Sequence, residues 1–166
     1  MAGYFYLAII HTGVQNMFDL KQQLYLLCGR HITDREAVLK KIVADAREAA
    51  NEDTKSSAGD KFETGREIMQ QEVELNLTRL GELSKLRQIL DMIRPEESRE
   101  VVAPGALVHT NHGSYYIAIS AGQLKTGGSL YYGISLDSPI GMKMKGHRAG
   151  DKFMLNNKHY IIESVN

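Results

Sequence analysis

Apolar residues recur at helical spacing over two long stretches of the first hundred residues. The first stretch places on one face Leu20, Leu24, Leu27, Cys28, Val38, Ile42, Ala46 and Ala49. The second runs from about Gly59 to Ile93 and aligns Phe62, Met69, Val73, Leu77, Leu80, Leu83, Leu86, Leu90 and Ile93. About 34 helical residues make a rod of roughly 50 Å, which cannot bury its own stripe. The pattern therefore predicts an antiparallel helical hairpin, or coiled coil, over residues 17–94.

Two polar segments interrupt these stretches. Thr33-Asp34-Arg35-Glu36 matches a capping box, so either a new helix begins there or one helix bends. Residues 51–67 read NEDTKSSAGDKFETGRE and predict the hairpin tip, near 51–61. The charged tip residues are Glu52, Asp53, Lys55, Asp60, Lys61 and Glu63. They are candidates for contact with a partner, and their acids also suit a solvated turn with capping carboxylates.

Residues 101–166 change to a strand pattern after a polar linker, 95–100, that begins with the helix-stopping Pro95. Strands are expected at 106–110, 114–120, 130–135, 152–155 and 160–165, with turns at Asn111-His112-Gly113 and Asn156-Asn157-Lys158. Ser138 is expected to cap one short helix that Gly146 ends. The predicted fold class is α+β, with a small antiparallel β domain carrying one short helix.

The apolar start, residues 1–16, lacks a basic region typical of a signal peptide and predicts an N-terminal extension, either a short strand or a disordered tail. The sequence has no apolar run of about 18 residues, so no membrane span is expected. The single cysteine, Cys28, indicates a buried thiol in a reducing, cytoplasmic compartment.

Composition adds one asymmetry. The net charge is zero, but residues 1–98 carry net −3 and residues 99–166 carry net +3. Tyr115-Tyr116 and Tyr131-Tyr132 are expected to place one ring on each face of a strand, one in the core and one exposed. The sequence contains no phosphate loop, nucleophile elbow or zinc-ligand spacing, so no motif indicates an enzyme. No small-molecule substrate is evident either.

The motif Ser138-Pro139-Ile140-Gly141, followed by Gly146 and Gly150-Asp151, resembles the carboxy-terminal motif of the bacterial Gre transcript-cleavage factors. The similarity extends from about Val102 to Ile162, and residues 42–48 (IVADARE) resemble the end of the family's first long helix. The resemblance implies an FKBP-like fold for residues 101–166, in which the motif residues are mainly structural.

The same resemblance implies a partner and a mechanism. Gre factors insert the hairpin into the secondary channel of RNA polymerase, where two tip acids help to hold a magnesium ion. On that basis the chain is not itself an enzyme, has no intrinsic cofactor, meets Mg²⁺ only in complex with polymerase, and contacts transcript or DNA there. The candidate metal ligands are Asp53 and Asp60.

The tip departs from the family pattern, since neither alignment register preserves the acid pair. Aligned through residues 46–48 the acid positions fall on Asn51 and Thr54, and aligned through Phe62 they fall on Lys55 and Ala58. The predicted function is therefore modulation of elongation, with cleavage stimulation left open. The alternatives are a structural or dimerisation coiled coil and, from the fold alone, a peptidyl-prolyl isomerase.

Overall fold

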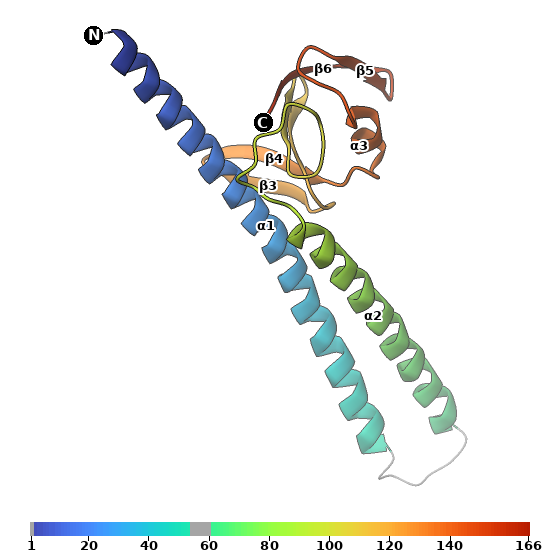
Figure 1. The fold of residues 1–166 in the computed structure, drawn as a ribbon. Coiled ribbons are helices and arrows are strands. Elements are labelled where there is room, and N and C mark those ends of the chain that lie inside the picture. The colour runs from blue at the N-terminus through green and yellow to red at the C-terminus, as the bar shows by residue number, and fades with distance from the viewer. Residues whose placement is uncertain (1, 54–60) are drawn as a thin grey trace. The chain divides into compact units, whose positions relative to one another are not determined.

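The computed structural model describes residues 2–53 and 61–166 and confirms the α+β class (Figure 1). The elements in chain order are α1 (Ala2–Asp53), α2 (Lys61–Asp91), β1 (Leu107–Thr110), β2 (Gly113–Ile117), β3 (Gly122–Thr126), β4 (Ser129–Ile134), α3 (Pro139–Met144), β5 (Lys152–Leu155) and β6 (Lys158–Val165). They form two compact units. One comprises the chain up to Gly29 together with Ile89–Asn166, and the other comprises Arg30–Gln88.

Helix α1 is continuous and is longer than the sequence predicts. Residues 2–16 are helical, so the expected strand or disordered tail is wrong for them. No helix begins at Thr33 either, because the chain is helical on both sides of it and a capping residue needs a non-helical backbone. Helix α1 can run without interruption because it contains no proline, and each of its three glycines costs only about 1 kcal/mol.

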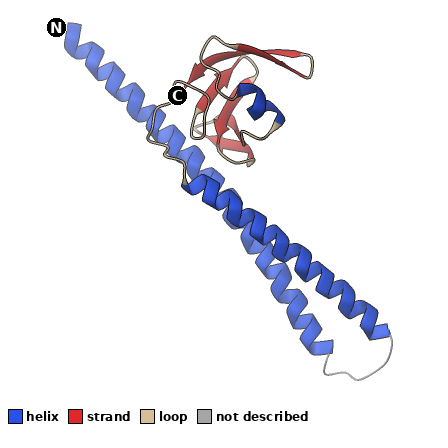
Figure 2. Cartoon of the chain, turned by 45° about the vertical axis from the view of Figure 1, so that its right-hand side comes forward, coloured by secondary structure: helices blue, strands red, loops and turns tan. Residues whose placement is uncertain are grey.

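In the unit of residues 30–88, both views draw α1 and α2 side by side (Figures 1 and 2). Ile32 and Val43 of α1 and Leu83 of α2 are buried. The expected face was misplaced at Val38, which is 60% exposed, and at Leu77, which is 43% exposed. Leu24, Cys28 and Ile32 of α1 are buried at steps of four residues, and Val43 follows eleven residues later, about three helical turns on.

The β domain is a mixed six-stranded sheet in the order β3-β4-β2-β1-β6-β5. The expected purely antiparallel sheet is wrong, because β2 and β4 pair in parallel. Strand β3 was not predicted. It has one buried residue, Leu124, and so carries no clear alternation of apolar and polar positions. The predicted turn between β5 and β6 is confirmed at Asn156 and Asn157, whose φ angles of 49° and 61° suit asparagine.

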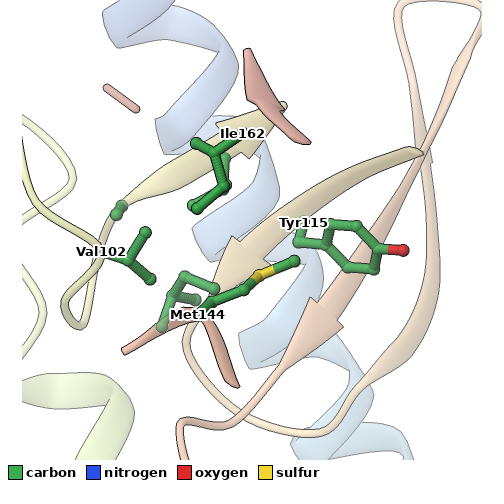
Figure 3. Packing of buried hydrophobic residues seen from close by; sticks show 7 residues of the cluster. Val102, Tyr115, Met144 and Ile162 are labelled. Atoms are coloured by element: carbon green, nitrogen blue, oxygen red, sulfur yellow. The ribbon is translucent and has the colours of Figure 1, made fainter. Parts of the chain in front are cut away.

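Both faces of the sheet are covered. On one face, α3 contributes Met144 to a core with Val102, Ile117 and Ile162 (Figure 3). The opposite face, which carries Tyr116, meets Tyr25 and Cys28 of α1. Tyr115 and Tyr116 are therefore both buried, at 8% and 0% exposure, and the expectation of one exposed ring in this pair is wrong.

Candidate functional site

The tip candidates lie at the ends of the two long helices and in the segment between them. Glu52 and Asp53 end α1, and Lys61 and Glu63 lie in the first turn of α2. Lys55 and Asp60 lie outside the described residues. The two proposed metal ligands, Asp53 and Asp60, therefore flank or fall within the undescribed segment, and their expected role stays a prediction.

The shaft of residues 30–88 is joined by one polar cluster. The Arg87 guanidinium lies 3.4 Å from a Glu36 carboxylate oxygen and donates to the Thr33 hydroxyl at 3.0 Å. Thr33 and Glu36, the first and last residues of the apparent capping box, thus bind a side chain of α2. The polar residues that match a capping box therefore make an interhelical contact and do not cap a helix.

Beside this cluster the shaft has a groove of about 540 Å³. Its apolar lining comes from both helices, and its charged lining is balanced between acids and bases. The lining residues are Asp34, Arg35, Val38, Leu39, Arg79, Glu82, Leu83 and Leu86.

The motif at residues 138–151 builds the start and end of α3. Ser138 is the N-cap, as predicted, and its hydroxyl accepts from the Gly141 amide at 3.1 Å while donating to the Ser135 carbonyl at 2.7 Å. Pro139 occupies the first turn, where its missing amide hydrogen is not needed. Ile140 packs against the core.

The glycines and the aspartate of this motif also serve the backbone. A Cβ at Gly141 would lie 2.1 Å from the Ser135 carbonyl oxygen. Gly146 and Gly150 have φ angles of 78° and 92°, which favour glycine. A carboxylate oxygen of Asp151 accepts from the Arg148 amide at 2.7 Å. These contacts define the fold locally, and none of them leaves a reactive group in position for chemistry.

A buried polar contact joins α1 to the linker that precedes the β domain. Lys21 is 3% exposed and donates to the Glu97 carbonyl at 2.5 Å. Burial, with a smaller effect of the Arg99 charge, lowers the pKa of Lys21 to about 8, although Glu97 and Glu96 oppose the shift. The linker of residues 95–100 is thus attached to α1, and Lys21 holds it there.

Cys28 lies one turn after Leu24 on the same buried face. It is fully buried, and burial raises the pKa of its thiol to about 12. The prediction of a structural thiol is confirmed, because a thiol with that pKa and no access to solvent is a poor nucleophile.

Aromatic rings gather on the α3 face of the sheet, where the sequence singled out only part of the set. Phe153 and Tyr160 are directly opposed across β5 and β6 and stack with centroids 4.8 Å apart. The missed signal is the Asn156-Asn157 turn. A two-residue turn places the third residue before it opposite the third residue after it, and these are Phe153 and Tyr160.

The described residues hold no group of three or more His, Cys, Asp or Glu side chains arranged to bind a metal. The imidazole of His109, which lies 2.7 Å from the Ser114 hydroxyl, has a pKa lowered by burial. Among the described helices, none combines the length and apolar character that crossing a membrane requires.

Comparison with models of known protein families and with curated proteins finds no match to this chain.

Proposed function

We propose that this chain binds RNA polymerase and modulates elongation in the manner of the Gre factors. The observation that carries the proposal is the order of contacts along α1 and α2. Gly29 lies near Leu90, Glu36 binds Arg87, and the groove joins residues 34–39 to residues 79–86. Residue numbers rise along α1 as they fall along α2, which supports an antiparallel hairpin with the tip predicted near residues 51–61.

The elements that follow the hairpin support the same proposal. A sheet with a short helix on one face, capped by Ser138 and followed by Gly146, supports the FKBP-like domain that the resemblance implies, although its mixed pairing departs from the antiparallel sheet that was expected. In this proposal the β domain docks on the polymerase and the hairpin reaches towards its active site. The chain supplies groups to that site and has no reaction of its own.

Association with polymerase is the first test. The tagged full-length chain is incubated with bacterial core RNA polymerase and recovered, with an unrelated tagged coiled coil as control. We expect polymerase to be retained by the chain and not by the control. Failure to retain the core enzyme overturns the proposed function.

The second test separates cleavage from other effects on elongation. Asp53→Ala plus Asp60→Ala removes the two candidate magnesium ligands. Asp45→Ala plus Asp91→Ala removes two exposed carboxylates elsewhere on α1 and α2. If the tip delivers the metal, transcript shortening in stalled complexes is lost only with the first pair. Shortening that survives the first pair shows that these carboxylates do not deliver it.

A second candidate function is dimerisation through the outer face of the shaft. Ile68 and Leu75 lie seven residues apart on α2 and are 60% and 51% exposed. Exposed apolar side chains at heptad spacing are typical of an association surface. Sedimentation over a range of concentrations tests this function, and a monomer throughout the range excludes it.

A further inference from the structure

Four rings form a row across the β5–β6 end of the sheet. The ring of His112 meets the ring of Tyr160 edge-on, with centroids 4.8 Å apart. Tyr160 stacks on Phe153 with ring planes 8° apart, and the ring centroids of His147 and Phe153 are 6.2 Å apart. The rings come from the turn before β2, from β6, from β5 and from the segment after α3. Residues far apart in the sequence thus build one continuous aromatic strip.

A second pair of rings joins the row to the core. Tyr115 hydrogen-bonds to Tyr160 and lies 5.8 Å from Tyr132. Figure 3 shows the Tyr115 hydroxyl pointing away from Val102 and Met144 of the core. Phe153 packs against the core that includes Met144 of α3, so the row begins at the edge of that core. Its members are not fully buried: His112 is exposed and the other three rings are half-buried.

Basic side chains flank the row. Lys158 is directly opposed to Leu155 and lies two residues before Tyr160, so it shares the face that carries the ring row. Lys145 and Arg148 lie within two residues of His147 and are exposed. Residues 143–158 hold five cationic side chains and one carboxylate, that of Asp151.

Most of these cations are not neutralised within the chain. Among the described residues, no ion pair involves Lys145 or Lys158. Arg148 lies 3.8 Å from Glu100, with both side chains largely exposed, an arrangement worth little in water. The row thus combines accessible rings with uncompensated positive charge.

We propose that this surface, defined by His112, Lys145, His147, Arg148, Phe153, Lys158 and Tyr160, binds single-stranded nucleic acid. Unpaired bases stack on aromatic rings displayed by a sheet, and nearby lysine and arginine side chains neutralise the phosphates. Every base has a π-face, so this recognition tolerates any sequence. An acidic peptide would use the cations but would leave the rings unused.

The inference goes beyond polymerase binding and does not depend on it. The surface is built entirely from residues of the β domain, so the isolated full-length chain is the reagent for its test. A failure here leaves the polymerase pull-down unaffected, and the reverse is also true.

The experiment measures fluorescence anisotropy of a labelled oligothymidine of about 12 nucleotides, a length suited to one small domain. Competitors are the matching duplex and poly-glutamate of equal charge. We expect the single strand to bind more tightly than either competitor. The logarithm of the association constant should fall linearly with the logarithm of the salt concentration, with a slope of about −0.7 for each phosphate neutralised.

Two pairs of variants locate the site. Lys158→Glu should weaken binding and lower the salt slope, whereas Lys125→Glu, at an exposed position on the opposite edge strand β3, should not. Tyr160→Leu should raise Kd by about 5- to 100-fold through lost stacking. Tyr160→Phe keeps the ring and should bind like the parent chain, which separates stacking from the hydrogen bond to Tyr115.

The proposal is overturned if the oligothymidine does not bind at about 100 μM protein in low salt, the weak end of non-specific affinities. It is also overturned if poly-glutamate competes as well as the oligothymidine itself. Equal loss of binding in Lys158→Glu and Lys125→Glu would likewise refute it, since binding would then depend only on overall charge. Lys158 is exposed, so its variant gives a valid result even if Tyr160→Leu unfolds.

Discussion

Among the described glycines, Gly141 leaves the least room for a Cβ atom. The substitution Gly141→Ala therefore tests whether the turn at the start of α3 stabilises the β domain. The new Cβ would lie 2.1 Å from the Ser135 carbonyl oxygen and 2.9 Å from both Leu136 Cα and Ser138 Oγ. Two of these three atoms are backbone atoms, so no side-chain rotation relieves the clash. The first turn of α3 must move.

The cost follows from what that movement breaks. Overpacking of a core position costs about 1–3 kcal/mol, and loss of the Ser138 cap adds about 1 kcal/mol. We therefore expect Gly141→Ala to lower the free energy of unfolding by about 3 kcal/mol. For a domain as small as the β domain, residues 101–166, that corresponds to a decrease of about 12 °C or more in Tm.

Urea unfolding of the full-length chain measures the effect. The chain has no tryptophan, so near-ultraviolet circular dichroism of the buried Tyr115 and Tyr116 reports on the β domain, and the signal at 222 nm reports on the helices. Gly81→Ala is the matched control. A Cβ there meets nothing within 4 Å, and alanine should stabilise the helix by about 0.5–1 kcal/mol.

The reasoning is refuted if Gly141→Ala unfolds within about 0.5 kcal/mol of the parent chain, the range of ordinary surface substitutions. It is also refuted if the two alanine variants lose equal stability, because the effect would then not come from the contacts of Gly141.

Three further predictions concern other parts of the chain. A double-mutant cycle of Arg87→Ala and Glu36→Ala should give a coupling of about 0.5–1 kcal/mol that weakens with salt, because both side chains are partly exposed; no coupling would show that the pair does not join the helices. The lowered pKa of Lys21 means that the unfolded chain binds more protons than the folded chain between about pH 8 and 10.5, so this group makes the folded state more stable as pH rises through that window. Urea unfolding should therefore show the parent chain gaining stability relative to Lys21→Met across that range, and a constant difference would contradict the assignment. Cys28 should react with a thiol reagent at neutral pH only at the rate of unfolding, since its thiol is buried with a pKa of about 12; immediate labelling of the native chain would contradict this.

Local signals in the sequence determined much of the β domain. The Ser138-Pro139 start of α3 and the Asn156-Asn157 turn each depend on residues within one or two positions, because capping and positive φ are properties of short segments. The two long helices were also predictable, since an apolar repeat of three and four residues defines a helix without reference to the rest of the chain.

Long-range contacts decided the remainder. The parallel pairing of β2 with β4, the burial of both Tyr115 and Tyr116, and the edge-on contact of His112 with Tyr160 depend on segments that the sequence does not place together. Thr33 shows the same limit, because a capping motif and an interhelical contact use identical side chains. Local chemistry thus determined the elements with clear caps, turns or apolar repeats, whereas β3 and the pairing of faces depended on the tertiary structure, because burial depends on what packs against each face.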